Sequence, residues 1–221
     1  MVNITGIFLE GIQPKVFEGT PALRVPSDVW GQNLLLKKGE SCLIEASSGR
    51  GKSSLCAFLY GLRKDYSGNI SFVTSEGQTL QSQECDFVSL RSNNISLMFQ
   101  DLKLFPELTA VENVMLKNRI TGFWSEEKCR NMLLRMNLMD VVDVPCGRMS
   151  FGQQQRVAFV RALAQPLDFL FLDEPVSHLD EGNARIMSQM IKERQIEDGI
   201  GVVVTSIGYR LPYDYERIIE L

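Results

Sequence analysis

The stretch from Ala46 to Ser54 is rich in glycine and serine and holds the residues with the clearest chemistry in the chain. It follows a short apolar run that ends at Ile44, and it leads into an apolar-rich segment, Leu55 to Leu62. A tight loop between a strand and a helix leaves backbone N–H groups free to converge on an anion, and the helix N-terminus adds partial positive charge. Lys52 would reach terminal phosphates as a point charge, and Ser53 would place its hydroxyl on Mg²⁺.

The first position of this loop departs from the usual phosphate-binding pattern, which begins with glycine. Ala46 is small, but its Cβ restricts backbone angles that glycine reaches freely. Taken alone, the stretch is also compatible with an ordinary glycine-rich turn that happens to contain Lys-Ser, because short motifs have many chance matches. The residues expected to surround the phosphates are Ala46, Ser47, Ser48, Gly49, Arg50, Gly51, Lys52, Ser53 and Ser54.

Two adjacent carboxylates follow the most continuous apolar run of the chain. Phe169 to Leu172 is typical of a parallel strand that is covered on both faces, and it ends in Asp173 and Glu174. Adjacent acids beside a buried strand are costly without a partner, which favours a functional role over a structural one. Asp173 can hold Mg²⁺ through water, and Glu174 can orient or polarise an attacking water.

Three other places carry weaker signals. Gln100 ends the apolar run from Ile95 to Phe99, where open α/β sheets place their ligands, although a solvated loop glutamine is the simpler alternative. Ser150 opens a helix that runs to about Ala164, and it forms either a second anion site or an ordinary serine cap. Phe17 is equally able to stack on a nucleotide base or to fill a core.

The elements that must position these residues alternate in type along the chain. Glycines and prolines divide residues 1–45 into short strands. A capping box at Thr109 to Glu112 begins a helix that ends near Asn118, and Ser125 begins a second helix. Asp180 caps a helix that runs to about Asp198. The apolar runs read as strands include Ile4–Leu9, Ala22–Val25, Gln32–Leu36, Ile70–Val73, and Gly201–Thr205 as a last buried strand.

Composition limits the classes of protein that remain. The chain has 221 residues, of which 44% are hydrophobic, which suffices for one domain with a sizeable core. The net charge of −4 gives no footprint for nucleic acid or an anionic membrane surface. We expect neither a membrane span nor a signal peptide. The five scattered cysteines indicate buried thiols in a cytosolic protein rather than a zinc site or disulfides.

The order of these features resembles the nucleotide-binding subunit of an ABC transporter over nearly the whole chain. The stretch from Met98 to Pro106, followed by Thr109 to Val114, looks most like the lipoprotein-export, macrolide-export and cell-division group. The matching motifs are the Walker A loop (Ala46–Ser53), the Q-loop (Gln100), the signature (Ser150–Gln155), Walker B (Phe169–Glu174) and the D-loop (Ser177–Asp180).

The resemblance implies an α/β fold: a P-loop NTPase core with a mainly parallel sheet, an N-terminal antiparallel β region, and a helical subdomain at 101–148. Residues 1–221 would form a single ABC ATPase domain, with 1–100 and 149–221 as the nucleotide-binding core. Such a chain binds and hydrolyses ATP with Mg²⁺ and powers a separate membrane permease. It would lie in the cytoplasm, peripheral to the inner face of the cell membrane.

The family also implies a head-to-tail dimer of two copies with two ATP molecules between them. Each site would combine the P-loop of one chain with Ser150, Gly152 and Gln153 of the other. Within the first chain, Mg²⁺ would be held by Ser53, Gln100 and Asp173, while catalysis would fall to Glu174 and Gln100, with Ser206 at the switch position.

Four positions depart from the family pattern. Met149 and Phe151 replace the leucine and first glycine of the signature, Ala46 replaces the first loop glycine, and Ser206 stands where a switch histidine is usual. The single histidine, His178, lies too early to take that place. At most, Ser206 would reach a phosphate through water.

These substitutions keep open an alternative, a regulatory module that closes on ATP with little hydrolysis, which the retained Lys52, Asp173 and Glu174 oppose. An ABC protein that acts on ribosomes or DNA is disfavoured, because such proteins usually carry two cassettes or long insertions and the charge balance here is acidic.

Overall fold

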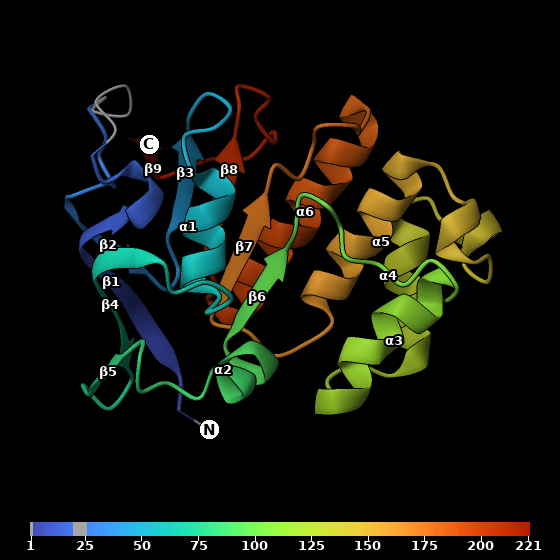
Figure 1. Ribbon diagram of the computed structural model, residues 1–221. Coiled ribbons are helices and arrows are strands. Elements are labelled where there is room, and N and C mark those ends of the chain that lie inside the picture. Colours follow the sequence, from blue (N-terminus) through green and yellow to red (C-terminus); the bar gives the residue numbers. More distant parts are fainter. Residues whose placement is uncertain (1, 20–25) are drawn as a thin grey trace.

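The computed structural model describes residues 2–19 and 26–221, which form two β-sheets with helices packed around them (Figure 1). In Figure 1 the antiparallel sheet lies on the left, the parallel sheet in the centre, and the helices of residues 110–163 on the right. This arrangement confirms the predicted mixed α/β fold. The strand expected at Ala22–Val25 lies outside the described residues.

Five parallel strands form the central sheet, in the order β6-β7-β8-β3-β9. Side chains of β7 alternate between two apolar cores: Phe169 and Phe171 pack on one face, Leu170 and Leu172 on the other. This two-sided burial explains the continuous apolar run. The bounds are β3 (Ser41–Glu45), β6 (Ile95–Met98), β7 (Phe169–Asp173), β8 (Gly201–Ser206) and β9 (Arg217–Glu220).

The buried strand expected at Gly201–Thr205 is β8, and one further strand was not predicted: β9 follows it and pairs with β3 at the edge of the sheet. Only Ile219 of β9 is buried, so an edge strand flanked by Arg217 and Glu220 lacks the apolar run of the inner strands.

The antiparallel sheet has the strand order β2-β1-β4-β5 and confirms the predicted N-terminal β region. Its strands β1 and β4 approach so closely that a Cβ on Gly68 would lie 2.5 Å from the Glu10 carbonyl oxygen. Glycine at position 68 is therefore a packing requirement. The bounds are β1 (Ile4–Pro14), β2 (Asn33–Lys37), β4 (Tyr66–Thr74) and β5 (Thr79–Gln81).

Helix α1 (Lys52–Leu59) packs between the two sheets, since its buried Leu55, Phe58 and Leu59 belong to the same core as β1, β2 and β4. The opposite face of the parallel sheet is covered by α5 (Phe151–Leu163) and α6 (Glu181–Asp198). Asp180 caps α6, as predicted, and its side chain accepts from the backbone N–H of Asn183. Two short elements complete this part of the molecule, α2 (Phe87–Asn93) and the 3₁₀ turn η1 (Lys15–Phe17).

Residues 101–148 form α3 (Ala110–Thr121), α4 (Glu126–Arg135) and two 3₁₀ turns, η3 (Met139–Val141) and η4 (Cys146–Arg148). The capping box of Thr109 and Glu112 is present, and Ser125 caps α4. These helices pack against α5 at the side of the molecule away from the antiparallel sheet (Figure 1). Within the described ranges, every helix is too short or too polar to cross a membrane.

Candidate functional site

The loop between β3 and α1 has the shape of an anion site. Gly51 sits in the left-handed region with φ of 95° and begins α1 without any side-chain cap, so the first amides of the helix are not bound by a capping side chain. A Cβ on Gly51 would lie 3.0 Å from the Trp30 ring and 3.3 Å from the Phe17 ring. The glycine is therefore fixed both by its backbone angle and by the two aromatic rings beneath the loop.

Lys52 points back into this loop and is only 4% exposed. Its ammonium donates to the carbonyl oxygens of Ala46 at 2.8 Å and Ser47 at 3.1 Å, and it lies 3.5 Å from Oε1 of Glu174. Two carbonyls and one carboxylate thus hold the charge at the centre of the loop. An incoming phosphate would compete directly with Glu174 for this amine.

Gln100 connects the carboxylate to the first turn of α1. Its Nε2 donates to Glu174 Oε2 at 2.9 Å, and its Oε1 lies 3.5 Å from Ser53 Oγ, at the limit of a hydrogen bond. Glu174 itself has φ of 50°, which is uncommon for a residue other than glycine. Such an outlier directly after a strand indicates that the carboxylate is held in position at some conformational cost.

Asp173 is 4% exposed and accepts a hydrogen bond of 2.6 Å from Thr205 Oγ1. The same hydroxyl accepts from the backbone N–H of Glu174 at 3.2 Å, so Thr205 supports both acidic residues. Thr205 was not among the residues predicted to belong to the site. It becomes visible only through the parallel register of β7 and β8, which places Thr205 opposite Asp173.

The residues present fit a magnesium ion. Ser53, Gln100 and Asp173 line one cavity of about 500 Å³, and hydroxyl, amide and carboxylate oxygens are ligands that Mg²⁺ accepts. No group of three or more His, Cys, Asp or Glu residues that could hold a metal occurs within residues 2–19 and 26–221. An ion here would therefore take its remaining ligands from phosphate and water.

Phe17 lies beside the loop. It lines the hollow over α1, and its ring meets Trp30 edge-on with centroids 6.1 Å apart. Trp30 in turn donates its indole N–H to the Arg50 carbonyl oxygen at 3.0 Å, and this hydrogen bond helps to hold the loop in place. The other predicted loop residues that line this hollow are Ser48, Gly49, Gly51, Lys52, Ser53 and Ser54.

The signature residues lie at the start of α5, where Phe151 lines the same cavity as Ser53, Gln100 and Asp173. Ser150 caps α5 in a reciprocal pair with Gln153: its hydroxyl accepts from the Gln153 N–H at 3.3 Å, and Gln153 Oε1 accepts from the Ser150 N–H at 2.9 Å. Ser150, Gly152 and Gln153 are not among the described residues that line the hollow over the loop. Within one chain, the loop and the signature serine are therefore not brought together.

Phe151, which replaces a signature glycine, contacts the following loop of its own chain. Its ring meets His178 edge-on with centroids 4.6 Å apart, and a Cβ on Gly152 would lie 3.0 Å from the His178 carbonyl oxygen. Gln155 also donates to the Pro175 carbonyl oxygen at 2.7 Å. The start of α5 thus packs against and is hydrogen-bonded to residues 175–178.

Ser206 is 2% exposed, and its hydroxyl is hydrogen-bonded within the turn that follows β8. It donates to the Tyr209 carbonyl oxygen at 2.8 Å and accepts from the Gly208 N–H at 2.9 Å. Ile207, rather than Ser206, lines the hollow over the phosphate loop. A water-mediated reach from Ser206 to a phosphate would require these turn bonds to change.

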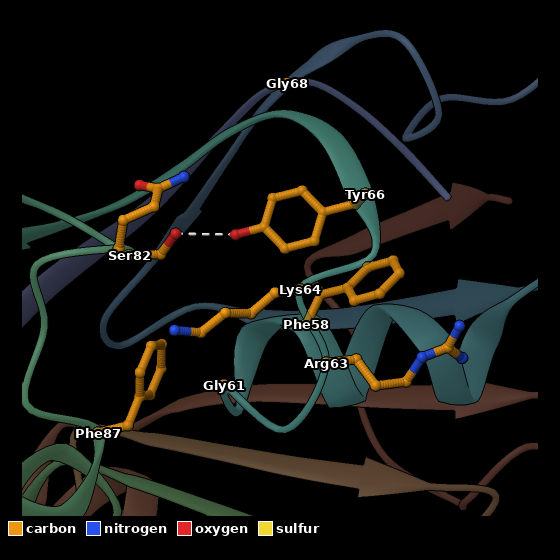
Figure 2. A pocket seen from close by; sticks show the side chains of 9 residues that line it. Phe58, Gly61, Arg63, Lys64, Tyr66, Gly68, Ser82 and Phe87 are labelled. Atoms are coloured by element: carbon orange, nitrogen blue, oxygen red, sulfur yellow. Dashed lines mark hydrogen bonds between the residues drawn. The ribbon is translucent and has the colours of Figure 1, made fainter. Parts of the chain in front are cut away.

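A smaller hollow of about 90 Å³ lies beyond the C-terminal end of α1 and holds none of the candidate site residues. Figure 2 shows Lys64 extending toward Phe87 while Arg63 points the other way. The Tyr66 and Ser82 hydroxyls are hydrogen-bonded at 2.8 Å along its side. The rings of Phe58, Tyr66 and Phe87 form part of its wall, and we assign it a packing role.

Comparison with known proteins places residues 30–177 within the family described as ABC transporter. Rv0073, an uncharacterised ABC transporter ATP-binding protein of Mycobacterium tuberculosis, is 33% identical over 96% of this chain. The chain spans 64% of the length of that relative. The putative hemin import ATP-binding protein HrtA of Staphylococcus haemolyticus is 34% identical over 86% of each protein.

Two solved structures have the same fold. The dimeric structure of MJ0796, a bacterial ABC transporter cassette, matches with a TM-score of 0.81 over 97% of this chain and 94% of that chain, at 28% identity. A post-hydrolysis dimer of MJ0796 bound to ADP and Pi matches with a TM-score of 0.75 over 90% of this chain and 87% of that chain, again at 28% identity.

Proposed function

Because this chain belongs to the ABC transporter family, we propose that it is the ATP-binding, ATP-hydrolysing subunit that powers a separate membrane permease. One observation carries the proposal: Lys52, Gln100 and Glu174 converge on the phosphate loop at the carboxyl end of the parallel sheet. Asp173 lies beside them, at the edge where open α/β sheets bind ligands.

The roles follow from the contacts. The amides of the loop and of α1 hold the phosphates, and Lys52 pairs with the terminal ones. Ser53, Gln100 and Asp173 would hold Mg²⁺, which neutralises phosphate charge when it is bound. Once a phosphate replaces Glu174 as the partner of Lys52, the Glu174 carboxylate is free to accept a proton from an attacking water. Its hydrogen bond from Gln100 keeps it oriented in that role.

A second copy of the chain would complete each site. Ser150, Gly152 and Gln153 do not line the phosphate hollow of their own chain, yet they offer a hydroxyl and helix N-terminal amides to an anion. The dimeric structures of MJ0796 support a dimer of this kind. In it, the signature residues of one copy would face the ATP that is held by the other.

Family membership supports the proposal of a separate membrane permease as the partner. It also supports a place in the cytoplasm, on the inner face of the cell membrane. We assign residues 101–148 to the helical subdomain that faces this permease. Phe105 supports the assignment, because it is 53% exposed just beyond Gln100.

A regulatory module with little hydrolysis remains the second candidate. The contacts of Ser206 favour the regulatory module, because the Ser206 hydroxyl is hydrogen-bonded to the turn after β8. A steady-state ATPase assay with the permease present separates the two candidates. Appreciable turnover supports the motor, whereas ATP-dependent dimerisation without turnover supports the regulatory module.

The binding site itself is tested by Lys52→Ala. Removing the ammonium leaves the terminal phosphates without their paired charge, so we expect ATP binding to be lost. Calorimetry with Mg²⁺ measures this directly, and Lys64→Ala, which changes an exposed lysine outside the loop, is the matched control. Equal ATP affinity in both variants would refute the assignment of the loop.

A further inference from the structure

The backbone of Glu174 needs support from its surroundings. Its φ of 50° lies in a region that residues with a Cβ rarely occupy, and such a conformation persists only where neighbouring contacts hold it. On the β7 side, the Thr205 hydroxyl accepts from the Glu174 N–H at 3.2 Å. On the other side, residues 175–178 form a turn that leads to α6. Contacts that fix this turn therefore help to fix Glu174.

Two residues of α5 hold the turn at its two ends. The buried side chain of Gln155 donates from Nε2 to the Pro175 carbonyl oxygen at 2.7 Å. Its Oε1 is buried and has no hydrogen-bond partner in the part of the chain that the structure describes, so the bond to Pro175 is the one that orients this amide. Gly152 approaches the end of the turn so closely that a Cβ would lie 3.0 Å from the His178 carbonyl oxygen.

The ring of Phe151 adds a third contact with this turn. Its centroid lies 4.6 Å from that of the His178 ring, and the two planes meet at 68°. This edge-to-face arrangement is one that aromatic pairs prefer. Nδ1 of His178 also lies 2.9 Å from Ser177 Oγ, so the imidazole is held from the turn as well. A glycine at position 151 has no side chain with which to make the ring contact.

We propose that Phe151 is a positioning residue for Glu174 of its own chain and acts through His178. The ring contact and the Gln155 hydrogen bond fix the turn, and the turn sets the direction of the Glu174 carboxylate. The proposal rests on the proposed function, which gives Glu174 the task of activating water. Phe151 lines the cavity that also holds Asp173, but an apolar ring offers no ligand to Mg²⁺ or to a phosphate.

A dimer offers a competing role for the same ring. The start of α5 would face the ATP that the partner copy holds, so Phe151 would then act on the partner's site by direct contact. The two roles differ in which copy must carry the phenylalanine. Positioning of Glu174 requires it in the copy that hydrolyses ATP, whereas direct contact requires it in the opposite copy.

The test is single-turnover hydrolysis by mixed dimers assembled from two differently tagged copies. One copy carries Glu174→Gln and should bind ATP without hydrolysing it, so all turnover comes from Glu174 of the other copy. Phe151→Ala is placed either in the hydrolysing copy or in the inactive one. Ile196→Ala in the hydrolysing copy is the matched control, because it removes an apolar side chain that is 76% exposed on α6.

We expect Phe151→Ala to lower the single-turnover rate by about three- to tenfold in the hydrolysing copy, which is the range that one aromatic pair supplies. The same substitution in the inactive copy should leave the rate unchanged. Phe151→Tyr keeps the ring and should restore the rate. ATP affinity of the separate chain should not change in any of these variants, because Phe151 does not line the hollow over the phosphate loop.

Two further measurements separate this role from a merely structural one. His178→Ala should slow hydrolysis by the same factor, and the Phe151→Ala/His178→Ala double variant should be no slower, since both substitutions remove one contact. The chain has a single histidine, so the NMR signal of the His178 imidazole is directly identifiable. The ring current of Phe151 should displace this signal, and Phe151→Ala should return it toward the position of free histidine.

Three results would overturn the proposal: a rate that falls at least as far with Phe151→Ala in the inactive copy, equal rates for Phe151→Ala and Ile196→Ala, or an imidazole signal that Phe151→Ala does not move. Absence of hydrolysis from mixed dimers whose hydrolysing copy is otherwise wild type is a different outcome. It would overturn the proposed function itself, and the positioning proposal with it.

Discussion

At the scale of single residues, the hydroxyl of Thr205 is the contact that orders the acidic pair. It donates to Asp173 and accepts from the N–H of Glu174, and Thr205 is fully buried. We expect Thr205→Val to keep the fold and ATP affinity but to lower kcat. A hydrogen bond to a charged group contributes about 1.5–3 kcal/mol, or roughly a ten- to hundredfold change in rate.

The check is steady-state ATPase of the assembled dimer, with Thr205→Ser as the control because serine keeps the hydroxyl. A Thr205→Val variant that turns over like the wild type would show that Asp173 is positioned without this contact.

Ser206 gives a second residue-scale prediction. Serine carries no charge, and its hydroxyl is bonded to the turn, so it supplies little to a phosphate. We expect slow hydrolysis by the wild type, with a gain of roughly ten- to a hundredfold in kcat for Ser206→His if the imidazole reaches the phosphate. Ser206→Ala should keep the wild-type kcat at some cost in stability. A fast wild type with no gain from histidine would show that another residue has taken over the role.

At the scale of elements, residues 102–106 divide between core and surface. Leu104 packs against the core that contains α3 and α5, whereas Phe105 is 53% exposed. We therefore expect Leu104→Asp to destabilise the fold by about 2 kcal/mol or more, because it places a charge against apolar side chains. Phe105→Asp should leave the melting temperature nearly unchanged and weaken permease binding. Thermal unfolding and permease affinity, measured on both variants, would contradict this division if Phe105→Asp unfolded like Leu104→Asp.

The helix starts were predictable because their signals are local. Thr109, Ser125, Ser150 and Asp180 each cap a helix at the expected place, with the side chain accepting from an amide three residues later. The loop between β3 and α1 was equally predictable, since its glycines and Lys52 lie within a few residues of one another, and its binding of phosphate stays a prediction. These features need no knowledge of the rest of the fold.

Features that depend on distant parts of the chain could not be predicted from the sequence. Thr205 supports Asp173 only because β7 and β8 pair in one parallel register. Trp30 braces the loop from twenty positions earlier in the sequence. The edge strand β9 was not predicted, because only Ile219 of its four residues is buried. In each case the decisive partner lies on another element, so the residue type alone carries no signal.

At the scale of the whole molecule, the central claim is that ATP draws two copies together and that Glu174 promotes the hydrolysis that separates them. One chain supplies the phosphate loop, while its own signature residues do not line that hollow. The site of a single copy is therefore incomplete, and closure of a dimer becomes the step that ATP controls.

The most direct measurement is the mass of Glu174→Gln in solution, by light scattering with and without Mg-ATP. The substitution keeps the shape of the side chain and removes its basicity, so ATP should bind, remain intact and hold the pair closed. We predict a monomer without nucleotide and a stable dimer with Mg-ATP, whereas a Glu174→Gln/Lys52→Ala double variant should stay monomeric. A Glu174→Gln protein that binds Mg-ATP yet remains monomeric at high concentration would contradict the account.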